Sequence, residues 1–344
     1  MRKTHLAILR ANIGRAFFLA LLIAALLFYV FLFSNRAAHR AARGARQPSL
    51  APIAEGRALI ISTHAAFCEP ATADPTPELK GAFARVLFEG SPRYWMVPPN
   101  EFSFLVTEGT TEVGVAIVTS FLKQYGPFQE YFRDSPPDAL MVDVGANIGL
   151  ASMPVAAMGR EVIAFEPVPS NQRAYMLSVC VNGFAGHVTL VGAAVGASSG
   201  SADIFVPRGR ADNTALGKDV STANVGGEAD SIRVPVVTLD AILRPEDVRR
   251  IWLLKIDVQG YELRVLEGAR AVLGALPHSA WVVAEHDPKL MAASGLADTT
   301  ADIAFMASLG FSAHLTWKGD AVPQSGWATV PLEEYGRDMW YKKL

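Results

Sequence analysis

The stretch that decides the fold reads V-D-V-G-A-N-I-G over residues 142–149. It carries the short apolar run 139–144, which predicts a buried strand, into a glycine-bearing turn and the start of a helix. Glycine lets the backbone come close to a ligand, and the first turn of a helix offers free N–H groups. Because Gly145 and Gly149 are four residues apart, the spacing differs from the dinucleotide pattern G-x-G-x-x-G. The turn therefore predicts a site for a smaller, zwitterionic group, with a purely structural strand–helix turn as the alternative.

Outward from this stretch, the pattern repeats as strand, turn and helix. Apolar runs separated by helical segments are typical of a parallel sheet covered on both faces, so we predict a doubly wound α/β fold. The predicted strands are 139–144, 161–166, 188–192, 252–257 and 281–285, and the predicted helices are 149–158, 170–182 and 261–273. The insert 197–232 is rich in Gly, Ser, Ala and Asp, which predicts a long loop with an edge strand at 202–206.

Polar side chains end three of the predicted strands, where open α/β sheets bind their ligands. Glu166 follows the second strand, and a carboxylate at this place accepts hydrogen bonds from a ribose diol. It predicts an adenosyl ligand, with an exposed turn carboxylate as the alternative. Lys255 and Asp257 point to the same side of a later strand. Because a buried Lys charge is costly unless it is paired, they are candidate catalytic groups or a structural ion pair.

The last apolar strand ends in Glu285-His286-Asp287, and either Glu285 or His286 is positioned to reach the same cleft. A histidine that is merely buried and hydrogen-bonded is the alternative. No His, Cys and Asp cluster has the spacing of metal ligands, so we predict no metal site.

Taken together, these motifs resemble the FkbM family of S-adenosylmethionine-dependent methyltransferases. The resemblance covers roughly residues 138–290 and implies a class I, seven-stranded, mostly parallel Rossmann-like fold, with methyl transfer usually to a hydroxyl oxygen. The motifs that carry it are V-D-V-G-A-N-I-G at 142–149, A-F-E-P-V-P-S-N at 164–171, V-T-L-D at 237–240, L-K-I-D-V-Q-G-Y-E at 254–262 and A-E-H at 284–286.

The resemblance also implies roles for individual residues. Glu166 would hold the ribose hydroxyls of the cofactor, and Asp257 and Lys255 would face the transferred methyl group. The other implied cofactor residues are Asp143, Gly145, Ala146, Asn147 and Gly149 on the methionine side, and Asn171, Ala193 and Ala194 near the ribose and adenine.

We predict that Asp257, Lys255 and His286 form the acceptor-side group, with one of them acting as general base. Gln259 departs from the family pattern, in which Glu is common at this place. If that Glu served as a base or a metal ligand, this protein would be impaired, whereas a role limited to hydrogen bonding is open to Gln as well.

Composition limits the partners. The chain has 344 residues, of which 51% are hydrophobic, and a formal net charge of −2. Residues 1–46 carry eight of the 31 Lys and Arg and none of the 33 Asp and Glu. The remainder is therefore acidic, which excludes nucleic acid as a partner of the body of the protein.

The N-terminal region predicts a membrane anchor. Phe17 to Phe33 is an uninterrupted apolar run at the short limit for crossing a bilayer. Because the cofactor is made in the cytosol, we predict a single-pass membrane protein whose catalytic domain faces the cytoplasm. The predicted segments are a basic tail at 1–16, the anchor at 17–33, a linker at 34–56, a small subdomain or cap at 57–135 and the methyltransferase domain at 136–344.

The predicted function is O-methylation of a sugar, a glycan precursor or a lipid-linked acceptor at the membrane. One alternative is a membrane-tethered module that binds an adenosyl ligand without turnover. A nicotinamide oxidoreductase is disfavoured because the G-x-G-x-x-G spacing is missing.

Overall fold

The computed structural model describes residues 59–61, 84–86, 94–96, 128, 130–207, 214–216, 229–323, 326 and 337–344. The chain divides into two compact units, Met1–Gln47 and Pro48–Leu344. All described residues belong to the second unit. The predicted tail, anchor and linker therefore lie outside the described residues.

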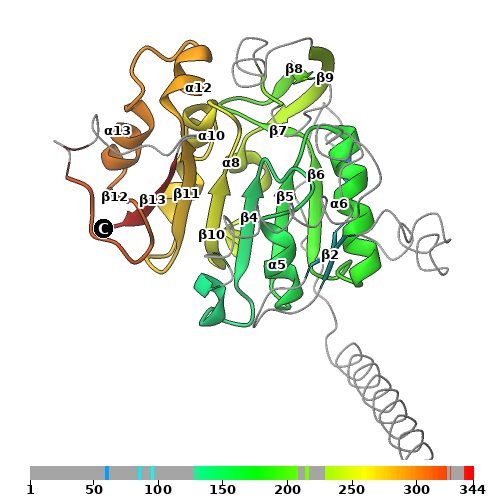
Figure 1. Cartoon of the computed structure of the whole chain (residues 1–344). Helices are drawn as coiled ribbons and strands as arrows, with labels where there is room; N and C mark the ends of the chain where they lie inside the picture. Colours follow the sequence, from blue (N-terminus) through cyan, green and yellow to red (C-terminus); the bar gives the residue numbers. More distant parts are fainter. Residues whose placement is uncertain are drawn as a thin grey trace, which may run out of the picture. The chain divides into compact units, whose positions relative to one another are not determined.

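An eight-stranded sheet forms the centre of the second unit (Figure 1). Its order is β1-β6-β5-β4-β10-β11-β13-β12. Strands β6, β5, β4, β10 and β11 run parallel to one another. Strand β1 is antiparallel to β6, and β13 is antiparallel to both its neighbours, β11 and β12. The strands are β1 Leu59–Ile61, β4 Leu140–Val144, β5 Glu161–Phe165, β6 Val188–Gly192, β10 Ile251–Ile256, β11 Trp281–His286, β12 Phe311–His314 and β13 Arg337–Lys343. The mostly parallel seven-stranded sheet predicted from the sequence is confirmed, and β1 adds an eighth strand at its edge.

Short helices cover the sheet (Figure 1). They are α5 Ser152–Ala157, α6 Pro169–Asn182, α8 Leu239–Ile242, α9 Pro245–Val248, α10 Glu262–Glu267, α11 Arg270–Ala275, α12 Pro288–Ala293 and α13 Ala301–Ser308. The helix predicted at 261–273 is divided into α10 and α11. Between them, Gly268 packs so closely on the backbone of Gly196 that a Cβ at this position would collide with the Gly196 carbonyl oxygen.

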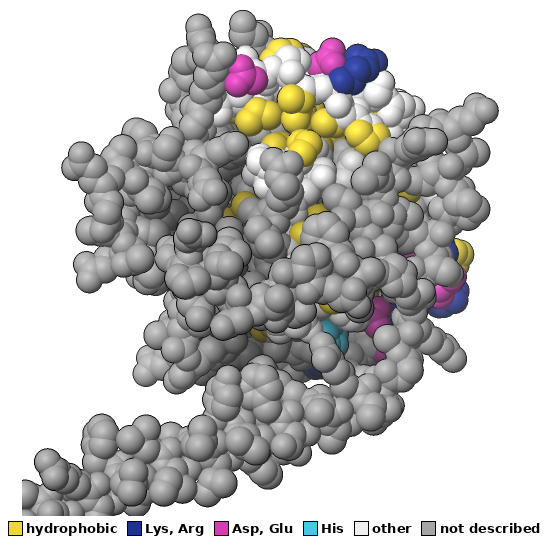
Figure 2. Space-filling model, turned by 90° about the vertical axis from the view of Figure 1, so that its right-hand side faces the viewer, with side chains coloured by type: hydrophobic (Ala, Val, Ile, Leu, Met, Phe, Trp, Pro, Cys, Tyr) yellow, Lys and Arg dark blue, Asp and Glu magenta, His cyan; other side chains and the backbone are white. Residues whose placement is uncertain are grey.

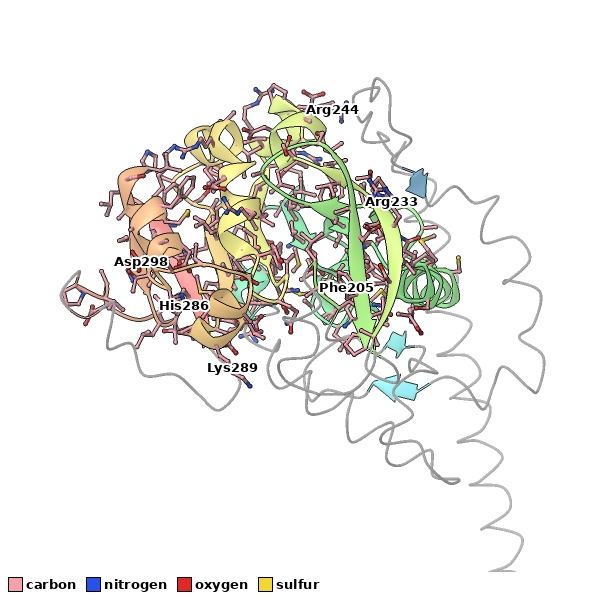
Figure 3. All side chains as sticks on the ribbon, turned by 90° about the horizontal axis from the view of Figure 1, so that it is seen from above. Phe205, Arg233, Arg244, His286, Lys289 and Asp298 are labelled. Atoms are coloured by element: carbon pink, nitrogen blue, oxygen red, sulfur yellow. The ribbon has the colours of Figure 1, made fainter. Side chains whose placement is uncertain are left out.

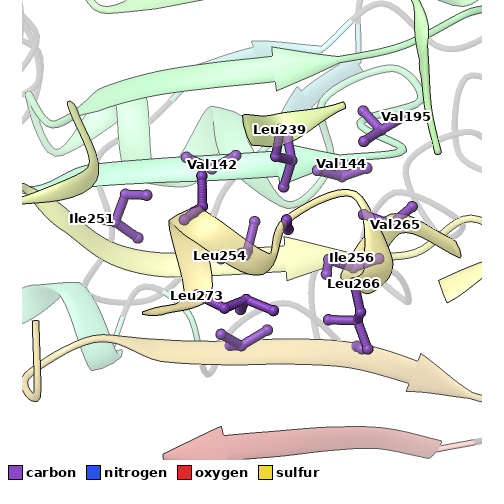
Figure 4. Close-up of a cluster of buried hydrophobic side chains, with 14 of the residues drawn as sticks. Val142, Val144, Val195, Leu239, Ile251, Leu254, Ile256, Val265, Leu266 and Leu273 are labelled. Carbon is purple, nitrogen blue, oxygen red and sulfur yellow. The ribbon is translucent and has the colours of Figure 1, made fainter. Parts of the chain in front are cut away.

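Two hydrophobic clusters lie on opposite faces of the sheet. All five residues of β4 are buried, as expected for a central parallel strand. Its alternate residues Val142 and Val144 pack with Val265 of α10 and other members of the first cluster (Figure 4). Met141 points the other way and packs with Met153 of α5 in the second cluster. The alternation of β4 therefore assigns Asp143 to the face covered by α5 and α6.

A smaller three-stranded sheet lies above the carboxyl ends of the central strands (Figure 1). Its strands are β7 Ala194–Val195, β8 Gly200–Pro207 and β9 Ala229–Val237. The edge strand predicted at 202–206 is confirmed as part of β8, which pairs with β9 along its whole length. Hydrophobic side chains gather over this hairpin, beside acidic and basic ones (Figure 2). A separate two-stranded sheet joins β2 Ala84–Val86 to β3 Tyr94–Met96.

The insert also reaches toward α12. Within the short segment 214–216, Ala215 exchanges backbone hydrogen bonds with Phe205 of β8. Ala215 is buried and belongs to a cluster with Leu290 of α12, against which Tyr261 is packed. The insert therefore connects the small sheet with the helix that follows β11.

The V-T-L-D motif has a structural role at two helix starts. Thr238 Oγ1 accepts the N–H of Ala241 at the start of α8. The carboxylate of Asp240 accepts the N–H groups of Ala271 at 3.0 Å and Val272 at 2.9 Å, at the start of α11. Asp240 thus stabilises a helix that lies about thirty residues further along the chain.

Replacing this carboxylate is expected to destabilise the fold without touching the site. Asp240→Ala leaves two N–H groups of α11 without their acceptor and should lower the free energy of unfolding by about 1 kcal/mol. Urea unfolding measures the change, with Asp138→Ala at another exposed Asp as the control. Equal stability of the two variants would contradict the capping role.

The predicted localisation requires a correction. In the part of the chain that the structure describes, no helix has the length and the hydrophobicity that crossing a bilayer requires. The prediction of a single-pass anchor is therefore corrected to this extent: no described helix supports it, and the run Phe17–Phe33 lies outside the described residues.

Candidate active site

The strand order places the candidate site between β4 and β10. The chain continues from β4 to β5 on one side, while β10 lies on the other, so the order reverses at this pair of strands. Ligands of open α/β sheets bind at such a reversal, beyond the carboxyl ends of the strands. Lys255 pairs in register with Asp143, and Ile256 pairs with Val144. The turn after β4 and the turn after β10 therefore begin side by side.

The turn after β4 uses three residues with left-handed backbone. Gly145, Asn147 and Gly149 have φ values of 76°, 52° and 90°. A Cβ on Gly145 would collide with the carbonyl oxygen of Asp257, so only glycine allows the two turns to approach this closely. Asn147, a non-glycine residue in a costly conformation, is held there by its contacts. Its side-chain Oδ1 is buried and accepts no hydrogen bond from any described residue.

Glu166 ties this turn to the end of β5. Its Oε2 accepts the N–H of Asn147 at 2.8 Å, and its Oε1 accepts the N–H of Val168 at 2.9 Å and the side-chain amide of Asn171 at 3.3 Å. Glu166 is 4% exposed, so the alternative of an exposed turn carboxylate is wrong. Burial raises the pKa of Glu166 to about 7, although the three hydrogen bonds act in the opposite direction.

Lys255 holds the centre of the site. Its ammonium donates to the carbonyl of Gly145 at 3.0 Å and forms ion pairs with Asp143 at 3.3 Å and Asp257 at 3.4 Å. Lys255 is 5% exposed, and Asp143 is fully buried. The charge of this buried lysine is thus compensated by two carboxylates, as its burial requires. A charged ammonium with these partners orients groups and balances charge, and it does not accept a proton.

Gln259 and Glu285 complete the acceptor end. Gln259 Nε2 donates to Asp257 Oδ1 and to Glu285 Oε2, both at 3.0 Å. Burial raises the pKa of Glu285 well above its usual range, and the nearby carboxylates of Asp257 and Glu262 raise it further. Asp257 and Glu285 are thus two acids that one amide holds together at the acceptor end.

The remaining predicted cofactor residues surround the turn. Asn171 on α6 is buried and reaches Glu166. Ala146 is buried, and its N–H donates to the carbonyl of Phe165 at 2.9 Å. Ala193 and Ala194 follow β6 and are also buried. The structure therefore brings these residues to the carboxyl ends of β4, β5 and β6.

His286 does not join the acceptor-side group. It follows Glu285 on β11, so its side chain points to the opposite face of the sheet. There His286 Nδ1 lies 2.9 Å from Asp302 Oδ2 on α13, and the Tyr341 hydroxyl donates to the same carboxylate. His286 lies on the side of α12 and α13, away from Phe205 and Arg233 of the small sheet (Figure 3). This correction follows from strand alternation, and it leaves Glu285 as the residue of this motif that reaches the site.

Glu262 is a site residue that the sequence analysis did not identify. Its Oε1 accepts the N–H groups of Val258 at 3.0 Å and Gly260 at 3.2 Å, which shapes the turn after β10. Glu262 is 1% exposed, and burial raises its pKa to about 8. The signal available in the sequence was a carboxylate at the start of a helix, three residues after a glutamine and next to a glycine turn.

The fold is that of the class I Rossmann-like methyltransferases. This assignment rests on the strand order with its antiparallel β13 and on the glycine turn joined to Glu166. The match to a family model agrees with it. Residues 143–311 match the model of the methyltransferase FkbM domain.

Two curated proteins are similar in sequence. The AMB antimetabolite synthetase AmbE of Pseudomonas aeruginosa is 31% identical over 207 residues, covering 50% of this chain. The match spans only 10% of that synthetase. The methyltransferase sdnD of Sordaria araneosa is 27% identical over 174 residues, covering 41% of this chain and 67% of its own length.

Solved structures with low sequence identity also match. The precorrin-6y C5,15-methyltransferase of Geobacter metallireducens is 15% identical, with a TM-score of 0.35, and covers 70% of this chain and 90% of its own. The magnesium protoporphyrin IX methyltransferase of Synechocystis, solved with bound S-adenosylmethionine, is 14% identical with a TM-score of 0.35, covering 71% and 90%.

Proposed function

We propose that this methyltransferase transfers a methyl group from S-adenosylmethionine to a hydroxyl oxygen of a sugar or a glycan precursor. The observation that carries the proposal is the pair of carboxylates, Asp257 and Glu285, that Gln259 joins at the carboxyl ends of β10 and β11. A hydroxyl oxygen must lose its proton to become methylated, and a carboxylate beside the reacting atoms accepts it. Neighbouring carboxylates also accept hydrogen bonds from neighbouring hydroxyls of one sugar ring.

The residues beside the acceptor end fit S-adenosylmethionine. The cofactor carries ribose hydroxyls, which Glu166 would hold, and two cationic groups, an ammonium and a sulfonium. Asp143 Oδ2 and Asn147 Oδ1 are buried and accept no hydrogen bond from any described residue, so acceptors for positively charged groups lie next to the glycine turn. Asp143 Oδ1 is already ion-paired with Lys255. Bound S-adenosylmethionine supplies the electrophilic methyl group.

The chain's own residues perform the proton chemistry. In the proposed reaction the acceptor oxygen forms a bond to the methyl carbon, the sulfur–methyl bond breaks and the hydroxyl proton passes to Asp257 or Glu285. Lys255 orients Asp257 through its 3.4 Å ion pair. Methyl transfer is an in-line displacement, so the reaction is accelerated when the acceptor oxygen is held in line with the sulfur–methyl bond.

Cofactor binding is expected to depend on pH through Glu166. The ionised carboxylate accepts hydrogen bonds from both ribose hydroxyls, and burial raises its pKa to about 7. Because the group is protonated below this pKa, affinity should rise as pH increases through 7 and level off above it. Between pH 6 and pH 8, the Kd for S-adenosylmethionine should fall about tenfold. Calorimetric titration of the full chain measures it.

Two variants make this titration decisive. Glu166→Ala should weaken binding at pH 8 about tenfold and remove the pH dependence, whereas Glu267→Ala, at a half-buried Glu paired with Arg264, should change neither. Binding that is unchanged in Glu166→Ala would reject the assigned ribose contact. Cofactor bound but never consumed across a panel of hydroxylated acceptors would favour the binding module without turnover.

A further inference from the structure

The backbone at Gln259 is held in a costly conformation. Gln259 has a φ of 55° and is followed by Gly260 with a φ of 87°. Gly260 packs against the backbone of Leu290, where a Cβ would come within 2.6 Å of the carbonyl oxygen. Glu262 accepts the N–H groups on both sides of Gln259. A non-glycine residue stays in this region only when its surroundings determine it, so the direction of the Gln259 side chain is fixed by the fold.

The Gln259 amide donates hydrogen bonds to two acids. A primary amide has two N–H groups, and Nε2 lies 3.0 Å from Asp257 Oδ1 and 3.0 Å from Glu285 Oε2. A carboxylate in the same place has no donor, and it would add a negative charge where several already lie. The charged and titratable groups around this amide are Asp257 and Lys255 at the end of β10, Glu262 of α10, Glu285 of β11, Asp287 before α12 and Asp338 of β13.

We propose that Gln259 is the positioning residue of the acceptor end, whose amide joins Asp257 and Glu285 into one hydrogen-bonded unit without a cation or a shared proton between them. This deepens the proposed function and rests on it for its kinetic consequence. Gln259 can therefore take the place of the Glu that is common in the family pattern, because a role that requires only hydrogen-bond donors suits Gln better than Glu.

The kinetic test uses two variants of the full chain. Gln259→Asn keeps an amide and suits the left-handed backbone, but it is one methylene shorter and does not reach both acids. We expect kcat to fall about 100-fold, as for a misplacement of about 1 Å, with the Kd for S-adenosylmethionine unchanged. Gln259→Glu should lower kcat at pH 8, where its carboxylate has no donor, and regain part of the activity at lower pH, where the protonated carboxyl group donates one hydrogen bond. Unchanged kcat in both variants would overturn the proposal.

The second test does not depend on activity. A carboxyl group introduced beside Asp257 and Glu285 would have a folded-state pKa above its unfolded value of about 4.3. Its ionisation then costs stability as pH rises above that value. Gln259→Glu should therefore destabilise the chain more at pH 8 than at pH 5 in urea unfolding. Asn182→Asp, an amide-to-acid change at the end of α6, is the matched control. A penalty that is the same at both pH values would reject the contacts of Gln259 with the two acids.

These two tests separate the possible failures. A pH-dependent penalty in Gln259→Glu without turnover of any hydroxylated acceptor by the wild-type chain would reject the proposed function and keep the hydrogen-bonded unit. Turnover by the wild type without the pH-dependent penalty would reject the unit and keep the proposed function.

Discussion

Asp257→Asn is expected to lower kcat about 10²- to 10⁴-fold, while the Kd for S-adenosylmethionine stays within a few-fold of the wild type. The substitution removes the negative charge and the proton acceptor but keeps the size of the side chain. Lys255 retains Asp143 and the Gly145 carbonyl as partners, so its buried charge remains compensated. Initial rates of methylation of a hydroxylated acceptor and calorimetry of the same preparation measure the two effects separately.

The matched variants identify which carboxylate takes the proton. Glu285→Gln removes the other acid that Gln259 contacts, and Asp203→Asn removes an exposed acid paired with Arg233 on the small sheet. Asp203→Asn should have the wild-type kcat. If kcat falls as much in Glu285→Gln as in Asp257→Asn, both acids are required for proton removal. A normal kcat in Asp257→Asn would exclude Asp257 as the base.

Gly145→Ala is expected to destabilise the fold by about 3 kcal/mol or more and to abolish cofactor binding. The residue has a φ of 76°, and the added Cβ would collide with the carbonyl oxygen of Asp257. Because the colliding group is backbone, no side-chain rotation relieves the contact. The turns after β4 and β10 must then separate, which moves both the cofactor side and the acceptor side. Urea unfolding measures the stability, and calorimetry measures the binding.

Gly159→Ala separates the cost of the left-handed backbone from the cost of the collision with Asp257. Gly159 has a φ of 75°, almost the same as Gly145, but a Cβ there would meet nothing within 4 Å. The free energy of unfolding of this variant should fall by only about 1 kcal/mol, the cost of placing alanine in the left-handed region. The difference between the two variants is therefore the contribution of the close approach. Equal destabilisation would contradict the contact between Gly145 and Asp257.

Much of the fold could be predicted because its signals are local. The five central parallel strands are apolar runs, and β4 is buried on both faces, so burial is visible in composition alone. Among the strands that were not predicted are β9, β12 and β13. Antiparallel and edge strands such as these have a polar side; in β12 buried and half-buried residues alternate. A short alternating pattern is harder to distinguish from a loop than a continuous apolar run.

The site was predicted unevenly for a similar reason. Asp143, Glu166, Lys255 and Asp257 stand at strand ends, and the chain order of strands already places them at one edge of the sheet. Glu285 and His286 are neighbours in sequence, and only the pairing of β11 shows which of them faces the site. The roles of Gln259 and Glu262 depend on the left-handed backbone of Gln259 and Gly260, which the sequence indicates only through Gly260.

The sequence by itself therefore determined the α/β class, the central strands and the methyltransferase motifs. These follow from hydrophobic periodicity and from residue types at strand ends, which act over a few residues. The tertiary structure decided which side chains meet. It pairs Lys255 with Asp143 across two strands, turns His286 toward Asp302 and directs Gln259 to two acids. Such contacts depend on strand register and on backbone angles, and packing of distant segments sets both.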